Sequence, residues 1–199
     1  MKLCTKYRQV ILASSSKTRI NYLKEHFDKV LAVRHRVQET ELKKRYSNLG
    51  FVNLVKLLAK KKAESIMLDY PENIVIGSDQ ILICEEKLIN KSQSFLEAKK
   101  NLINLRGKKH KLISSTYVIK NTKFYSEETK EAELLFKNIS QKKIEDYLKE
   151  NKDVLMSVGS YRIEDNNKYN FLEVLRGDHE TIIGFPLEKL KSKFMKDIK

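Results

Sequence analysis

A serine-rich turn near the N-terminus carries the first residues whose types and spacing could do chemistry. Ser14, Ser15 and Ser16 directly follow the aliphatic run at residues 8–13, and a helical pattern follows them. The first turn of a helix offers free backbone N–H groups and a partial positive charge, so together with these hydroxyls it suits a phosphate group. Arg19, within that first turn, adds a fork-shaped donor for phosphate oxygens. The plainer alternative is a turn in which Ser16 only caps the helix.

The second candidate is Asp79, a carboxylate inside the otherwise apolar run of residues 73–84. Together with Gly77, Ser78 and Gln80 it separates two clusters of isoleucine, valine and leucine. Burial disfavours a charged carboxylate, so Asp79 needs a cation or a metal ion as its partner. A role as metal ligand or general base would supply such a partner. The alternative is a β-bulge that brings Asp79 to the surface.

Two lysines could serve as cations beside Asp79. Lys62 lies in a predicted helix at residues 51–68, whose apolar residues recur at helical spacing and which ends before Pro71. Lys91 follows Asp79 after a predicted hairpin. We therefore expect an acid and its cations to come from neighbouring segments of the chain.

Hydrophobic periodicity predicts the elements that hold these residues. We expect a strand at residues 8–13, a helix with one apolar face at 17–27, and a buried strand at 73–84. The remaining predicted elements are helices at 94–105, at 140–149 and from 186 to about 194, and strands at 111–119, 153–162, 169–176 and 181–183. Strands and helices mixed in this way indicate an α/β domain.

The composition limits the class of protein. The chain has 199 residues, a length that suits one domain, and 41% of them are hydrophobic. That content excludes disorder as the dominant state, because a sizeable core can form. Only two prolines and six glycines occur, so collagen-like, proline-rich and mucin-like chains are excluded as well.

Cysteine usage and apolar run lengths indicate the compartment. Cys4 and Cys84 lie in unrelated contexts and fit neither a disulfide framework nor a C-x-x-C metal site. The apolar stretch at residues 10–13 is shorter than the ~7–15 residues of a signal-peptide core, and no run approaches the ~20 apolar residues of a membrane span. We expect a soluble, cytoplasmic protein. Surface or capping roles are expected of the four histidines, which share no metal-ligand spacing: His26, His35, His110 and His179.

The chain is strongly basic. Lysine and arginine number 40 against 26 aspartate and glutamate residues, which gives a formal net charge of +14. Such a charge would serve a nucleic-acid-binding module. The lysines are spread along the whole chain, however, and no basic block alternates with aromatic residues as a stacking platform would. Nucleic-acid binding is therefore disfavoured as the main function, and a small polyanionic substrate fits the positive field equally well.

Several segments, in chain order, resemble the signature motifs of the Maf family. LASSSKTR at residues 12–19 resembles the family pattern Leu-Ala-Ser-x-Ser-Pro-Arg-Arg, and IVIGSDQIL at residues 74–82 resembles its strand with the catalytic aspartate. GDHETIIGFPL at residues 177–187 matches the distal family element that ends in Gly-Leu-Pro-Leu. The further matches are Glu39 after Gln38, LAKKKA at residues 58–63, INKS at 89–92, LRGKKHKL at 105–112 and SVGSY at 157–161.

This resemblance implies an α/β fold with a mixed twisted central sheet, flanking helices and two lobes around a cleft, as a single domain over residues 1–199. It implies hydrolysis of nucleoside triphosphates between the α- and β-phosphates, which releases a nucleoside monophosphate and pyrophosphate. The implied cofactor is a divalent metal cation: Mg²⁺, Mn²⁺ or Co²⁺. Removal of noncanonical or surplus nucleotides, a looser link to cell division and a homodimer are further family associations.

Position by position, Asp79 corresponds to the family's catalytic residue, which accepts a proton from the attacking water. Glu39 and Asp79 fall on its metal-binding positions. Its substrate-binding positions fall on Ser14, Ser16, Arg19, Lys62, Gln80 and Lys91. The chemistry of these residue types agrees, because a triphosphate needs cations around its oxygens and Mg²⁺ needs carboxylates.

The sequence departs from the family pattern at positions close to the expected site. Lys17 and Thr18 stand where Pro-Arg is usual. Asn90 and Ser92 flank Lys91 in place of glycine and proline. These changes leave room for a second hypothesis, a catalytically silent regulator that binds nucleotides without hydrolysing them.

The departures also bear on which base is preferred. Family branches differ broadly between pyrimidine triphosphates and 7-methylguanosine triphosphate. Gln80 and the Ser-Tyr pair at residues 160–161 resemble the second branch, whereas Thr18 matches neither. The sequence therefore leaves the base open.

Overall fold

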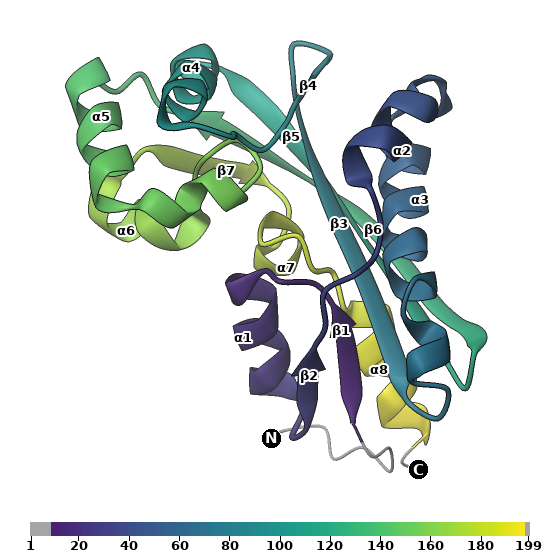
Figure 1. The fold of residues 1–199 in the computed structure, drawn as a ribbon. Helices are drawn as coiled ribbons and strands as arrows, with labels where there is room; N and C mark the ends of the chain where they lie inside the picture. The colour runs from purple at the N-terminus through teal and green to yellow at the C-terminus, as the bar shows by residue number, and fades with distance from the viewer. Residues whose placement is uncertain (1–8, 198–199) are drawn as a thin grey trace. The chain divides into compact units, whose positions relative to one another are not determined.

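A computed structural model describes residues 9–197, which form two compact units (Figure 1). The N-terminal unit consists of residues 9–79, 114–130 and 184–197, and the central unit of residues 80–113 and 131–183. Cys4 lies outside the described residues. In the described part of the chain, no helix has the length and apolar character that a bilayer crossing requires.

The described strands form one seven-stranded sheet. They are β1 (Val10–Ala13), β2 (Val30–Ala32), β3 (Ile74–Cys84), β4 (Lys87–Ile89), β5 (Lys109–Lys120), β6 (Lys123–Phe136) and β7 (Leu172–Arg176). Their order is β2-β1-β3-β5-β6-β7, with β4 also paired to β3. The pairs β1–β2 and β1–β3 are parallel, whereas β3–β4 and β6–β7 are antiparallel. The expected mixed α/β fold is therefore confirmed.

Eight α-helices accompany the sheet in the described residues. They are α1 (Lys17–His26), α2 (Glu39–Arg45), α3 (Phe51–Glu64), α4 (Phe95–Leu105), α5 (Gln141–Glu150), α6 (Asn166–Tyr169), α7 (His179–Ile182) and α8 (Glu188–Asp197). Short 3₁₀ turns add η1 (Ser47–Leu49), η2 (Met67–Asp69), η3 (Lys152–Met156) and η4 (Ile163–Asp165).

In the N-terminal unit, α3 lies directly against β3 (Figure 1). The contact depends on Gly77, because a Cβ atom there would lie only 2.1 Å from the backbone oxygen of Ala59 and 2.9 Å from the Cβ of Ala63. Glycine thus lets a helix backbone approach a strand at van der Waals distance. The approach brings Lys62 of α3 to the level of Asp79, two residues further along β3.

In the central unit, a two-residue turn at Glu85 and Glu86 joins β3 to β4. Both residues have positive φ, at 50° and 57°, as the tight turn of an antiparallel hairpin requires. Helices α4 and α5 pack on this part of the sheet with a core that includes Leu102, Tyr147 and Phe171. Cys84 is buried in the same core, as expected for a small apolar residue.

Most predicted elements near the serine turn and Asp79 are confirmed. β1, α1 and β3 lie where the periodicity placed them, and Ser16 caps α1. The helix predicted to run to residue 68 ends at Glu64, and its residue Val52 is exposed. α4, β5, α5 and α8 also match their predictions to within a few residues, and β7 covers the second half of the strand predicted at 169–176.

Two predicted strands are wrong. Residues 153–162 form η3 and a turn, because Gly159 and Ser160 both have positive φ, which ends any extended segment there. Residues 181–183 belong mainly to α7, because Asp178 Oδ1 accepts hydrogen bonds from the N–H and the hydroxyl of Thr181, both at 2.7 Å. Such an N-cap starts a helix rather than a strand.

Candidate active site

β3 holds Asp79 in the interior of the N-terminal unit. The strand runs without interruption from residue 74 to residue 84, and Asp79 is 3% exposed. The alternative of a surface bulge is therefore wrong. Its Oδ2 atom is buried and has no hydrogen-bond partner, whereas its Oδ1 atom accepts a hydrogen bond from Lys62.

Lys62 lies between two carboxylates. Its Nζ atom donates to Asp79 Oδ1 and lies 2.9 Å from Glu39 Oε1, and the residue itself is 3% exposed. Removing a lysine from water is costly unless opposite charges surround it, and here two carboxylates do so. The structure thus brings together three of the residues that the sequence selected, from α2, α3 and β3.

Glu39, the first residue of α2, has a second partner that the sequence did not indicate. His35 Nε2 lies 3.3 Å from the same Oε1 atom. The N–H of Val37 donates to His35 Nδ1 at 3.2 Å, so the ring proton is assigned to Nε2, where it can be donated to Glu39. His35 therefore helps to hold the carboxylate of Glu39 in place and is not a surface residue without contacts.

Arg19 on α1 is held by the backbone carbonyl group of Ser78. Its Nη1 donates to the backbone oxygen of Ser78 at 3.0 Å, and Ser78 Oγ donates to the backbone oxygen of Gly184 at 2.6 Å. Its Nε atom is buried without a partner. Burial lowers the pKa of Arg19, and the charges of Asp79 and Glu39 oppose that shift. The guanidinium therefore lies within electrostatic range of both carboxylates.

Gly184 shapes the space around Arg19. A Cβ atom at this position would lie 2.4 Å from Nη2 of Arg19, and the residue has a φ of +81°. Neither Ser78 nor Gly184 was selected as a site residue from the sequence. Ser78 acts on the guanidinium through its backbone oxygen and Gly184 through its lack of a side chain, and the sequence does not show that either residue lies next to Arg19.

The serine turn forms the predicted cap. Ser16 Oγ accepts from the N–H of Arg19 at 3.5 Å, and the N–H of Ser16 donates to Ser14 Oγ at 3.2 Å. Ser14 is buried and Ser15 is exposed. The cap is thus present, and a phosphate-binding role for Ser14 and Ser16 stays a prediction.

Two of the selected residues belong to the central unit. Gln80 Nε2 donates to the backbone oxygens of Thr181 and Ile182, at 3.0 and 2.9 Å. Lys91 forms an isolated antiparallel bridge with Val158. Their substrate-binding roles stay predictions, and the residues that the structure groups around Asp79 are those of the N-terminal unit.

Asp79 and Glu39 are oxygen donors of the type that binds a divalent cation. Within residues 9–197, no three acidic, histidine or cysteine side chains gather as a ready-made metal site. Asp79 Oδ2 nevertheless lacks a partner, and Glu39 lies on the other side of Lys62. Mg²⁺ in nucleotide-binding proteins is commonly held by one or two carboxylates together with phosphate oxygens and water. The donor set meets that description.

Comparisons with known proteins give one family and several named relatives. Residues 9–196 match the family model described as "Maf-like protein". A "Nucleoside triphosphate pyrophosphatase" of Legionella pneumophila (strain Philadelphia 1) is 34% identical over 183 residues, which is 92% of this chain and 90% of the relative. One of Pelagibacter ubique is 32% identical and covers 96% and 99%.

A "7-methyl-GTP pyrophosphatase" of Bartonella henselae is 35% identical over 92% of this chain and 93% of its own length. Among solved structures, the Ham1 protein of Staphylococcus aureus matches with a TM-score of 0.41 and 12% identity, over 66% of this chain and 73% of that one. With the family model matched over nearly its whole length, the chain belongs to the Maf family.

Proposed function

We propose that this protein is a metal-dependent nucleoside triphosphate pyrophosphatase. It would hydrolyse the anhydride bond between the α- and β-phosphates and release a nucleoside monophosphate and pyrophosphate. The observation that carries the proposal is the buried group in which Lys62 joins Asp79 and Glu39 while Asp79 Oδ2 has no partner. Relatives that cover most of this chain bear the names of such enzymes.

Asp79 is the proposed general base. Lys62 donates to its Oδ1 atom, which leaves Oδ2 to accept a proton. An attacking water forms a new bond to phosphorus, the bridging P–O bond breaks, and the water's proton moves to Asp79 Oδ2. The electron pair of the broken bond leaves with the departing pyrophosphate. Proton transfer to a positioned carboxylate contributes roughly 10²–10⁴-fold to such rates.

Arg19 and Lys62 supply positive charge for the triphosphate. Arg19 has a buried Nε–H without a partner and a guanidinium fixed by the backbone of Ser78, so it can donate to phosphate oxygens without reorganising. Ser14 and Ser16 at the start of α1, and Lys91 and Gln80 in the central unit, complete the proposed set of substrate-binding residues.

Charge balance favours a divalent cation in this reaction. Asp79 and Glu39 already match Lys62 and Arg19 in charge, so the negative charge of a triphosphate would find no excess cation among these four residues. Glu39 and Asp79 would hold Mg²⁺, Mn²⁺ or Co²⁺. The ion would neutralise charge that develops on the departing pyrophosphate. Lys62, between the two carboxylates, would keep them at a fixed spacing.

One assay tests the proposal. The purified chain is incubated with each of the common nucleoside triphosphates and with 7-methyl-GTP, in the presence of Mg²⁺, Mn²⁺ or Co²⁺, and pyrophosphate and orthophosphate are measured separately. We expect pyrophosphate with at least one nucleotide, and none in EDTA. The preferred nucleotide would then indicate whether the enzyme acts on a modified nucleotide, as the name of the Bartonella relative states for that protein.

The two rival hypotheses give different results in the same experiment. A catalytically silent regulator would bind a nucleotide, detectable by calorimetry, without releasing either phosphate product. A nucleic-acid-binding module would release no pyrophosphate and would bind duplex or single strands with a steep salt dependence. Release of orthophosphate alone would also contradict the proposed cleavage position.

A further inference from the structure

The segment of residues 90–92, which carries Lys91, is bonded to a strained turn at Gly159 and Ser160 in the central unit. From this we propose that Ser92 and Ser160 are positioning residues that fix the place of Lys91. The inference rests on the proposed function, because Lys91 matters to a substrate only if the site binds a triphosphate. The hydrogen bonds concerned are those of Ser92, which stands where the family pattern has proline.

Three successive residues of the segment are tied down. Lys91 pairs with Val158 in an antiparallel bridge. Ser92 Oγ lies 2.6 Å from Ser160 Oγ, so one hydroxyl donates to the other. Asn101 Nδ2, on α4, donates to Ser92 Oγ at 3.0 Å and to the backbone oxygen of Asn90 at 3.3 Å.

Lys91 and Ser92 are neighbours in the sequence but differ in burial. Ser92 and Ser160 are 7% and 0% exposed, whereas Lys91 is exposed. In an extended segment, consecutive side chains point to opposite faces. The hydroxyl bond of Ser92 thus fixes the backbone from the inside, next to the exposed residue Lys91.

The turn that receives Ser92 holds an unfavourable conformation. Ser160 has a φ of 60°, a region that residues other than glycine rarely occupy. Gly159 before it also has positive φ, and a Cβ atom there would lie 2.5 Å from Leu82 of β3. Strained residues of this kind persist only where the surroundings determine them strongly, and they cluster at functional sites.

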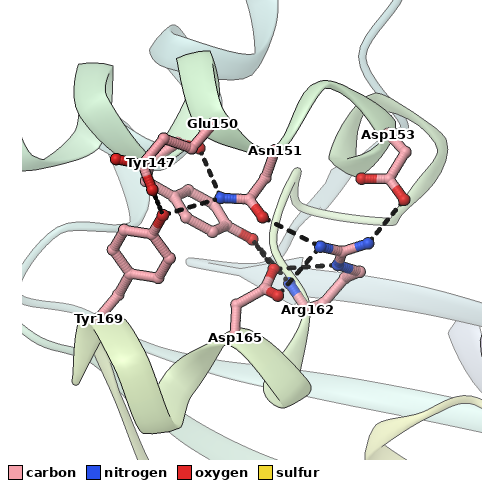
Figure 2. A network of polar contacts seen from close by, with 7 residues as sticks. All are labelled: Tyr147, Glu150, Asn151, Asp153, Arg162, Asp165 and Tyr169. Atoms are coloured by element: carbon pink, nitrogen blue, oxygen red, sulfur yellow. Dashed lines mark hydrogen bonds and ion pairs between the residues drawn. The ribbon is translucent and has the colours of Figure 1, made fainter.

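The surroundings do determine this turn. Figure 2 shows Arg162, two residues after Ser160, in a network with Asn151, Asp153 and Asp165. Its guanidinium donates to Asp165 at 2.9 and 3.0 Å and to Asp153 at 2.7 Å. Its backbone N–H donates to the hydroxyl of Tyr147 on α5 at 3.2 Å.

Tyr161, which lies between Ser160 and Arg162, anchors the same side of the turn to a second element. Tyr161 is buried, and its hydroxyl lies 2.6 Å from His110 Nε2 on β5. The turn is therefore attached to α5 by the Arg162 network and to β5 by Tyr161, and it passes this rigidity to Ser92. Where a proline restricts the backbone covalently, this chain restricts it by a buried pair of hydroxyls.

The test is a set of variants analysed by steady-state kinetics with UTP and 7-methyl-GTP. In Ser92→Ala and Ser160→Ala we expect KM to rise about 3- to 10-fold, the size of one lost hydrogen bond, with kcat changed less than KM. The double variant should be no worse than either single one. Ser92→Thr, which keeps the hydroxyl, should restore KM.

Two further comparisons separate positioning from general damage. In a Lys91→Ala background, Ser92→Ala should change KM no further, because there is no ammonium left to place. Ser94→Ala is the matched control: Ser94 caps α4 by accepting from the N–H of Glu97 at 3.2 Å, so its loss should lower the melting temperature and leave KM unchanged. Effects of Ser92 and Ser160 that add fully, or that persist without Lys91, would overturn the proposal.

Failure of the proposed function can be told apart from failure of this inference. If no variant and no wild-type protein releases pyrophosphate, the proposed function is wrong. The fastening itself is then measured by amide hydrogen exchange of peptides that contain residues 88–93. Faster exchange in Ser92→Ala, by about tenfold, supports the fastening, and exchange equal to that of the wild type overturns it.

Discussion

At the scale of single residues, the site depends on a lysine that has little freedom. Lys62 is buried, and its ammonium contacts carboxylates on both sides. If either carboxylate loses its charge, the ammonium is left with one partner in a dry environment, which is costly. Asp79 balances the charge of Lys62 through Oδ1, and its proposed second function is to accept a proton through Oδ2. A substitution can separate the two.

Asp79→Asn keeps the shape of the side chain and removes its charge and basicity. We expect kcat for pyrophosphate release to fall by roughly 10²-fold or more, the contribution of a general base. Circular dichroism should show the fold retained, because Glu39 still pairs with Lys62. Asp69→Asn is the control, since Asp69 forms an exposed ion pair with Arg36 and should leave kcat unchanged. A variant at Asp79 with near-normal turnover would remove it from the role of base.

Gly184→Ala tests whether the place of Arg19 matters. The added methyl group would meet the guanidinium at 2.4 Å and displace it. We expect kcat/KM to fall about 10-fold or more, because small displacements of a charged group weaken its contact with the transition state. Gly107→Ala is matched in backbone conformation, with a φ of +73°, but meets no atom closer than 3.9 Å. If both variants lose the same activity, backbone strain explains the effect and crowding of Arg19 does not.

At the scale of elements, the packing of α3 on β3 decides how Lys62 meets Asp79. The helix can approach the strand only because residue 77 is glycine. Lys62 is next to Ala63, which contacts Gly77, and Asp79 lies two residues after Gly77 on the strand. The same packing buries Leu58, Ala59 and Ala63 on one face of α3. Helix and strand are thus held in one register by apolar burial, and the ion pair follows from that register.

Gly77→Ala should separate the helix from the strand. Overpacking of this kind costs about 1–3 kcal/mol, so the free energy of unfolding measured in urea should fall by that amount. Catalysis should fall as well, because Lys62 moves with α3. Val52→Ala on the exposed side of the same helix should change the stability by less than about 0.5 kcal/mol. A stable Gly77→Ala protein with wild-type kinetics would contradict the register argument.

Elements with regular apolar spacing and clear caps were predictable from the sequence. Ser16 caps α1 as expected, and Ser94 and Ser140 cap α4 and α5 where those two helices were predicted to begin. β6 was not predicted, because two of its inward positions are the polar residues Ser126 and Glu128, which interrupt the alternation that marks a strand. Glu128 can be buried there because it accepts a hydrogen bond from the N–H of Lys189 at the start of α8, a contact that no local pattern shows.

The candidate site was also predictable in part, because some of its residues are recognisable by their type and position and others only by their contacts in the fold. Asp79 can be recognised by its charge within an apolar segment. Lys62 is the last of three consecutive lysines, and the predicted helix and the family resemblance select it. His35 does not, because its effect on Glu39 depends on the N–H of Val37 that fixes its tautomer. Contacts that use backbone atoms, such as Arg19 with Ser78, require the fold before they can be recognised.

At the scale of the whole molecule, the chain passes from one unit to the other next to residues of functional interest. Of the four crossings, one falls between Asp79 and Gln80 and another between Ile183 and Gly184. On the N-terminal side, Ser78 binds the backbone oxygen of Gly184. On the central side, Gln80 binds the backbone oxygen of Ile182. Both crossings are thus tied by side chains within their own unit, so local order is maintained where the chain leaves each unit.

The pH dependence of unfolding provides a test of the central unit as a folded body. Burial lowers the pKa of His110 from its usual 6.5 to about 4. Between these values the unfolded chain binds a proton that the folded chain does not, so the stability is complete above about pH 6.5 and declines as the pH falls towards 4. Below that, both states are protonated and the decline from this group ends.

His110→Gln removes this titration and keeps a polar partner for Tyr161. Unfolding in urea is followed between pH 7.5 and 4 for both proteins. We expect the wild type to lose up to about 3 kcal/mol more than the variant over this range, since each unit of pKa shift corresponds to about 1.4 kcal/mol. Because His110 is 2% exposed, solvent should screen little of this effect. Parallel pH curves for the two proteins would mean that the imidazole is hydrated, and that the contact between β5 and the Tyr161 turn is looser than the structure shows.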